Sequence, residues 1–203
     1  MRTRRPLALA ATALALAAVL SACSSHSSDM AGVNATAAIV AGQEGDIAFA
    51  QLMIPHHEQA VEMADMALER ETSAEVAALA EQIKGAQDPE IEQMAGWLTA
   101  WGAPREMPGM SSDGSMDHGS DDMGGMTMDG MMTAEDMAAL GAAAGTAFDE
   151  KWITLMIAHH EGALTMASQV LRTTTDAEVR TLAEAIVVGQ KAEIAEMKGL
   201  LAS

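Results

Sequence analysis

The chain has 203 residues, one cysteine, 2% aromatic residues and a formal net charge of −18. That length allows one compact domain or two very small ones, and so acidic a chain is a poor partner for nucleic acid and favours cations. With Cys23 alone, no intramolecular disulfide can form.

Residues 1–22 have the pattern of an export signal. Three arginines within the first five residues precede an apolar run that ends in small residues, and such a segment is removed from the mature protein. Leu-Ser-Ala-Cys at 20–23 looks like a lipobox, which implies cleavage before Cys23 and lipidation of its thiol. A plain secretory signal is the alternative. No later run can cross a bilayer, so we expect a lipid-anchored protein outside the cytoplasm, on the cell membrane.

The segment that follows, residues 23–42, is polar and has no periodic apolar pattern, and we expect it to be a disordered tether. Beyond it the chain repeats itself. Shifted by 103 positions, residues 46–98 align without a gap on 149–201, and 25 of the 53 pairs are identical. The sequence therefore predicts two copies of one structural unit, 43–103 and 133–203.

Each copy has the apolar period of two helices. Phe49, Met53 and Ala60 share one stripe of the first helix. The second helix is predicted to begin at Thr72, and its twin at Thr175, because each threonine is followed three residues later by glutamate. Two hairpins that each bury one face should dock on each other, so we expect an all-α four-helix bundle with pseudo-twofold symmetry.

Prolines interrupt the first copy at Pro55 and Pro89, where the second copy has Ala158 and Ala192. A proline inside a helix removes a hydrogen bond and kinks the axis, or it separates two shorter helices. Because alanine is accepted at the twin positions, the sequence favours long, kinked helices.

The insert at 104–132 is rich in Met, Asp, Gly and Ser and is predicted to be flexible. Thr133 then looks like the cap of a short helix. Thioether sulfur suits Cu(I) and, by similar softness, Ag(I), so we interpret the insert as a metal-capture segment, with a low-complexity spacer as the alternative. Its candidate ligands are Met107, Met110, Met116, His118, Met123, Met126, Met128, Met131 and Met132.

The motif Met-Ile-x-His-His-Glu occurs at 53–58 and again at 156–161. At helical spacing both imidazoles of each motif can face the bundle interior or its rim, and bundles hold metals with such side chains from facing helices. The candidate ligands of a twin pair of sites are Met53, His56, His57, Met63 and Glu90, with their twins Met156, His159, His160, Met166 and Glu193.

Two alternatives account for the same residues without this metal chemistry. The histidines fit equally well as core residues hydrogen-bonded to Glu90 or Gln87, and Met94 and Met197 are better explained as core packing. A ferritin-like di-iron oxidoreductase would use Glu-x-x-His, whereas the chain has Gln87-x-x-Glu90 in that place. The missing histidine disfavours iron, which we keep as the alternative metal. The third possibility is a structural or partner-docking envelope lipoprotein.

The motif and its surroundings resemble a bacterial family known as domain of unknown function 305. The residues that carry the resemblance are Asp46, Phe49, Met53 to Glu58, Ala60, Met63, Ala64, Leu79, Ile83, Gln87, Glu90 and Ile91. It implies a ferritin-like four-helix bundle that is exported and often lipid-anchored, and some members bind copper or silver in metal tolerance. We therefore expect a protein that captures Cu(I) or Ag(I) at the cell envelope, alone or with a metal-handling partner, and the alternative is a metal-dependent oxidoreductase.

Overall fold

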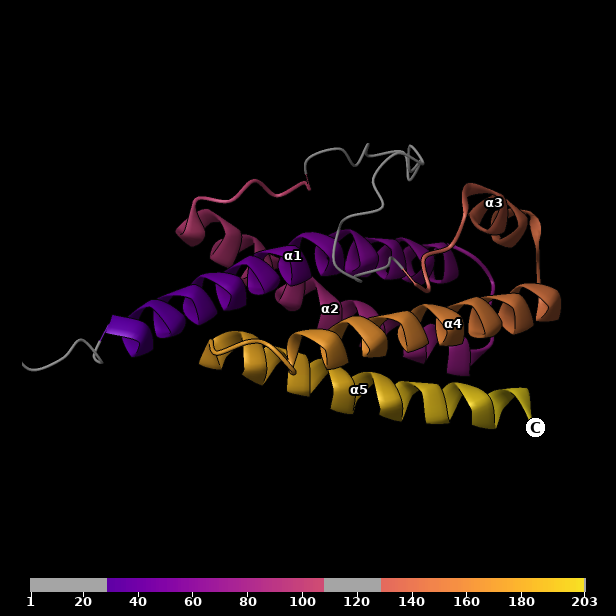
Figure 1. Cartoon of the computed structure of the whole chain (residues 1–203). Helices are drawn as coiled ribbons and strands as arrows, with labels where there is room; N and C mark the ends of the chain where they lie inside the picture. Colours follow the sequence, from indigo (N-terminus) through magenta and orange to yellow (C-terminus); the bar gives the residue numbers. More distant parts are fainter. Residues whose placement is uncertain (1–28, 108–128, 203) are drawn as a thin grey trace, which may run out of the picture.

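The computed structural model describes residues 29–107 and 129–202, and within these ranges it contains five helices and no strand (Figure 1). The helices are α1 (Asp29–Leu68), α2 (Ala74–Trp101), α3 (Ala134–Ala142), α4 (Thr146–Val170) and α5 (Ala177–Leu201). The predicted export signal and Cys23 lie outside the described residues.

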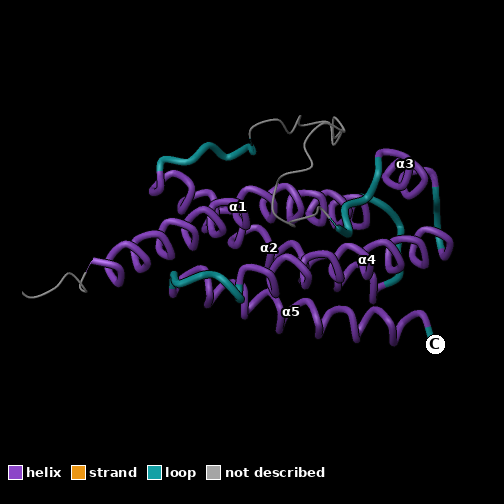
Figure 2. Tube along the Cα trace, in the orientation of Figure 1, coloured by secondary structure: helices purple, strands orange, loops and turns teal. Residues whose placement is uncertain are grey.

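Two hairpins, α1 with α2 and α4 with α5, pack into one bundle (Figure 2). Indole groups tie the hairpins together: Trp152 Nε1 donates to the Met63 carbonyl at 2.8 Å, and Trp97 Nε1 donates to Glu178 Oε2 at 3.1 Å. A backbone contact is added where Ser73 N donates to Asp149 Oδ2 at 3.0 Å. The all-α bundle of two duplicated hairpins is confirmed.

Helix α1 begins at Asp29, well before the end of the tether predicted at 23–42. Residues 29–42 are therefore helical, and the boundary expected from the sequence differs from the structure. Once a helix is nucleated in the packed part of α1, each added residue gains a backbone hydrogen bond, and an alanine-rich segment extends it at little cost.

The second helix of each hairpin is capped one residue later than expected. Ser73 accepts from Val76 N, and Asp176 accepts from Glu178 N and Val179 N. The Thr72 hydroxyl instead donates back to the carbonyl of Ala67, so the residue after it takes the cap.

The predicted cap at Thr133 and the long helices through the prolines are confirmed. Thr133 and Asp136 form a reciprocal capping box at the start of α3. Pro55 and Pro89 lie inside α1 and α2, which run through them as single long helices.

The core consists of two apolar clusters, which are related to each other by the internal repeat. The first cluster includes Phe49, Met53, Met94 and Met166, and the second includes their repeat partners Trp152, Met156, Met197 and Met63. In each of the four bundle helices, one end belongs to the first cluster and the other end to the second. Polar residues occupy the turn between them.

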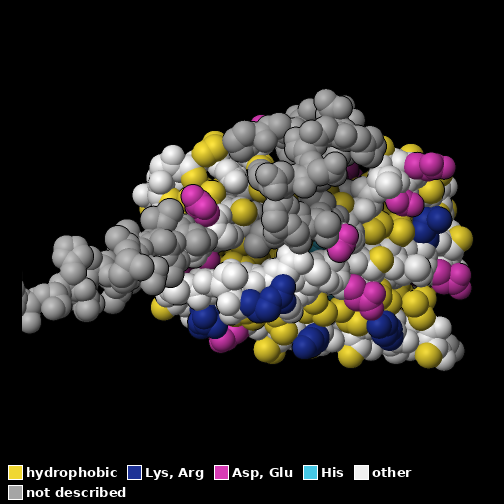
Figure 3. Space-filling view, in the orientation of Figure 1, with side chains coloured by type: hydrophobic (Ala, Val, Ile, Leu, Met, Phe, Trp, Pro, Cys, Tyr) yellow, Lys and Arg dark blue, Asp and Glu magenta, His cyan; other side chains and the backbone are white. Residues whose placement is uncertain are grey.

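Among the described residues, the exposed large hydrophobic side chains are Leu68, Val188 and Leu201. Figure 3 shows charged side chains dispersed over one face, with most of its Lys and Arg side chains over α4 and α5. None of the described helices is both long and apolar enough to span a membrane.

Candidate functional site

A layer of buried polar side chains separates the two apolar clusters. Each bundle helix contributes to this central layer, and every member is at most 5% exposed. Its residues are His56 and His57 from α1, Gln87 from α2, His159 and His160 from α4, and Gln190 and Glu193 from α5. Burying so many polar groups costs free energy that an apolar layer would not.

His56 and His159 meet at the centre of this layer. Their ring centroids are 3.7 Å apart, with the planes tilted by 37°. The two residues are twins under the repeat, so the pseudo-twofold axis that exchanges the halves passes between them. Twin residues touch only at such an axis. The structure thus brings one histidine of each predicted site together.

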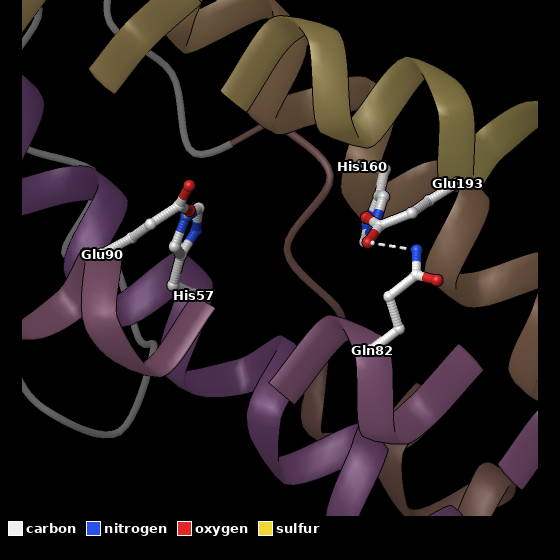
Figure 4. A network of polar contacts seen from close by, with 5 residues as sticks. All are labelled: His57, Gln82, Glu90, His160 and Glu193. Atoms are coloured by element: carbon white, nitrogen blue, oxygen red, sulfur yellow. Dashed lines mark hydrogen bonds and ion pairs between the residues drawn. The ribbon is translucent and has the colours of Figure 1, made fainter. Parts of the chain in front are cut away.

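His57 and His160 each pair with a glutamate of their own hairpin (Figure 4). His57 Nε2 lies 2.7 Å from Glu90 Oε2, and His160 Nε2 lies 2.8 Å from Glu193 Oε2. Because a carboxylate can only accept, each Nε2 donates this hydrogen bond, and in the neutral form of the ring Nδ1 has the lone pair. Carboxylates in this position orient metal-binding histidines in many proteins.

The two glutamates are not equivalent. Glu193 also accepts from Gln82 Nε2 at 3.1 Å, and its side chain is 7% exposed, whereas the side chain of Glu90 is 20% exposed. The reason lies in the sequence, because the repeat partner of Gln82 is Ala185. The second hairpin therefore has the better covered histidine–glutamate pair.

Most of the central layer lacks hydrogen-bond partners. Within the described part of the chain, no partner is found for Nδ1 of any of the four histidines, for Nε2 of His159, or for the side-chain amides of Gln87 and Gln190. Of the two partners that the core alternative named, Glu90 pairs with His57, whereas Gln87 pairs with no histidine. Buried polar groups are normally hydrogen-bonded. A cluster of buried polar groups without partners is therefore suited to bind an ion or water.

The two central imidazoles are neutral. Burial, followed by the positive charge of a protonated His57, lowers the pKa of His56 from 6.5 to about 3. Burial, followed by the positive charge of a protonated His56, holds the pKa of His159 well below 6.5. Neutral imidazole is the form that binds a metal ion, so these residues need not lose a proton first.

The predicted thioether ligands of the helices lie in the clusters that flank the layer. Met53, Met63, Met156 and Met166 are all fully or almost fully buried. Met53 and Met156 precede the central histidines by one helical turn. Met94 and Met197, predicted to be core residues, are buried in the same clusters.

The ends of the insert fall within the described residues, and its middle does not. Met107 packs against the first cluster and Met132 against the second, and Met131 is half-buried. Met110, Met116, His118, Met123, Met126 and Met128 lie outside the described residues. Across 29–107 and 129–202, no three side chains of His, Cys, Asp or Glu are grouped so that they could hold a metal ion.

Sequence reasoning missed three residues around the layer, namely Gln59, Gln82 and Asp129. Gln59 and Gln82 belong to repeat positions where the second half has glycine or alanine. A comparison of the mismatched positions, in addition to the identical ones, would have drawn attention to them. Asp129 acts through its carbonyl, which accepts from His56 Nε2 at 3.3 Å, and a backbone contact leaves no sequence signal.

Comparisons with known proteins agree on one family. The model for the family described as "Domain of unknown function (DUF305)" matches residues 46–201. A DUF305 protein from Streptomyces coelicolor, described as a candidate secreted protein, is 35% identical and has a TM-score of 0.68; the match covers 78% of this chain and 92% of that chain. A DUF305 fragment from Deinococcus radiodurans is 32% identical, with a TM-score of 0.65 and coverage of 78% and 95%.

A further similar structure is CopM in its Cu(I)-bound form. It is 31% identical to this chain, with a TM-score of 0.59, and the match covers 76% of this chain and 94% of CopM. CopM has also been solved in Cu(II)-bound and Ag-bound forms. No curated protein matches the chain.

Proposed function

The chain belongs to the DUF305 family, and from this membership and its central layer we propose that it binds Cu(I) or Ag(I). The observation that carries the proposal is the pair His56 and His159: fully buried, in ring contact across the pseudo-twofold axis, neutral, and with nitrogen lone pairs that no described residue uses. CopM, similar over most of its length, has been solved with both metals.

The chemistry of the side chains favours a soft ion. Imidazole and thioether suit copper, whereas Mg²⁺, Ca²⁺ and other hard ions prefer oxygen ligands. We assign the central ligands to His56 and His159, with thioethers from Met53 and Met156 one turn away on the same helices. His57 and His160 serve the same ion or a second one through Nδ1, while Glu90 and Glu193 hold their Nε2 protons. Met63 and Met166 are the remaining helical candidates.

The insert acts before the histidines in this proposal. Its methionines and His118 bind soft ions weakly at the cell surface, and the histidine layer retains them or passes them to an envelope partner.

The predicted lipid on Cys23 keeps the protein at the membrane. Replacing Cys23 by Ala should release it from the membrane fraction, and persistent tight membrane association would contradict the anchor.

Competition between metals tests the function. The chain without residues 1–23 is exposed together to Cu(I), Ag(I), Zn(II) and Fe(II), and the retained metal is measured by elemental analysis. We expect copper and silver to be retained, and tight retention to be lost in a His56→Ala, His159→Ala double variant. Preferential retention of zinc or iron would contradict the proposal.

The same measurement separates the insert from the helices. Replacement of 108–128 by a Gly/Ser linker of equal length should lower the number of weakly bound Cu(I) ions and leave tight binding unchanged. Loss of tight binding in that variant would place the principal site in the insert.

A further inference from the structure

The last residues of the insert are docked across α1 and α4 beside the central histidines. We call residues 129–132 the strap; Figure 2 draws it within the loop that passes between α1 and α4 into α3. The Asp129 carbonyl accepts from His56 Nε2 at 3.3 Å. Gln59 binds the other end of the strap through two hydrogen bonds. Its Nε2 donates to the Met132 carbonyl at 2.9 Å, and its Oε1 accepts from Met132 N at 2.7 Å.

Two glycines make this docking possible. A Cβ added at Gly162 would lie 1.8 Å from the Asp129 carbonyl oxygen, and one added at Gly130 would lie 2.8 Å from the Ala158 carbonyl oxygen. Gly130 also has φ +87°, a conformation that other residues rarely adopt. The strap thus rests directly on the backbone of α4, at the turn that follows His159.

The internal repeat shows that the strap can dock only on the assembled bundle. Gln59 and Gly162 are twins, and the two halves have diverged there into complementary roles. The glutamine of the first half holds the strap, and the glycine of the second half leaves room for it. A single hairpin has only one of these parts.

The beginning of the insert is fixed to the same helix. Gln51 Nε2 donates to the Pro104 carbonyl at 2.8 Å, and Arg105 pairs with Glu58. Glu58 and Gln59 directly follow His56 and His57 in α1. The described residues on both sides of 108–128 are therefore attached to the part of α1 around the histidine pair.

We propose that the strap is a gate for metal exchange at His56 and His159, an inference that rests on the proposed function. In the closed state seen here, Asp129 holds the Nε2 proton of His56 and the strap lies over the α4 turn of His159. An ion enters when the strap lifts, which breaks the hydrogen bond to His56 and the two bonds to Gln59. Lifting also moves Met131 and Met132, the last methionines of the insert, away from the bundle.

Gly162→Ala tests the gate from the helix side. The added methyl group cannot coexist with the docked Asp129 carbonyl, while alanine is a better helix former than glycine, so α4 itself is not weakened. Gly130→Ala displaces the strap from its own side. Gly189→Ala and Gly199→Ala are matched controls, because both lie in α5 and an added Cβ would meet nothing within 4 Å.

Two readouts are compared in these four variants and the unaltered chain. The first, made without metal, is the rate at which diethyl pyrocarbonate modifies His56 and His159, located by mass spectrometry. The second is the rate at which Cu(I) is taken from a coloured chelator complex. With a smaller closed population, we expect both rates to rise about tenfold in the Gly162 and Gly130 variants. The controls should not change.

The outcomes separate the gate from the proposed function. Cu(I) uptake at the unaltered rate in both strap variants, with binding intact, would overturn the gate and leave the function standing. Failure of the unaltered chain to bind Cu(I) would overturn both. A faster uptake accompanied by faster histidine modification, confined to the strap variants, supports the gate.

Discussion

The four histidines have the same sequence surroundings but different roles in the bundle. His56 and His159 touch at the symmetry axis, whereas His57 and His160 are each held by a glutamate. This division follows from one residue of difference along a helix, which turns a side chain by about 100°. All four rings are fully buried, and burial is the main cause of the lowered pKa values of His56 and His159.

The lowered pKa values predict that the metal-free protein loses stability in acid. The unfolded chain takes up protons on these histidines below pH 6.5, while folded His56 stays neutral down to about pH 3. Stability is therefore complete above pH 6.5 and falls as the pH decreases toward 3. At pH 5, His56 alone should cost about 2 kcal/mol.

Denaturant unfolding of the metal-free chain at pH 7.5 and pH 5 measures this loss. A His56→Leu, His159→Leu variant serves as the control, because leucine does not titrate and its pH dependence should be much smaller. Equal stability of the unaltered protein at both pH values would show that the rings are accessible to protons in the folded state.

Proline is one difference between the helices of the two halves. Helix α2 runs through Pro89, while α5 has Ala192 at the twin position. Neither helix is interrupted there, so packing against the bundle is strong enough to offset a missing hydrogen bond. The cost must then be present as lost stability instead of as a broken helix.

Exchanging these two residues should change stability in opposite directions. Pro89→Ala restores a backbone hydrogen bond and is expected to stabilise the protein by about 1–3 kcal/mol, whereas Ala192→Pro should destabilise it by about 3 kcal/mol or more. Thermal unfolding followed by circular dichroism measures both. A lower melting temperature for Pro89→Ala would indicate that the bend at this proline is needed for packing.

In the complete bundle, the central histidines of the two predicted sites meet at one place. Symmetry places His56 against His159, so an ion bound at the axis would take ligands from both halves. The flanking clusters supply three buried methionines each, in equivalent positions. The halves still differ, since Glu193 has Gln82 as a second partner and the strap joins Gln59 of one half to the Gly162 backbone of the other.

A double-mutant cycle tests whether the centre is shared. If one ion is bound by both central histidines, His56→Ala removes most of the tight Cu(I) affinity, and adding His159→Ala removes little more. The combined loss should be clearly smaller than the sum of the single losses. Competition with a chelator at pH 7.5 gives the affinities. Additive losses would show two independent sites.

Most of the fold follows from features that are local in the sequence. The repeat of 53 residues, the apolar stripes and the short-range capping signals are enough to predict two hairpins, their docking and the capping box at Thr133. The predictions that differ from the structure concern helix ends. Residues 29–42, predicted to be part of a tether, are helical, and two helix caps lie one residue after the predicted threonines. Helix ends depend on small differences among competing hydrogen bonds, such as that of Thr72 with Ala67.

The sequence by itself determined the residue types of the candidate site and their twofold repetition, because helical periodicity places side chains on faces. Only the tertiary structure decided which of them meet. The antiparallel packing of α1 against α4 brings His56 to His159 and buries both rings. The neighbouring histidines, His57 and His160, each pair with a different glutamate. It also decided where the insert returns, since Asp129 reaches His56 through a backbone carbonyl across 73 positions of sequence. Periodicity describes one helix at a time, and contacts between helices depend on the register in which they pack.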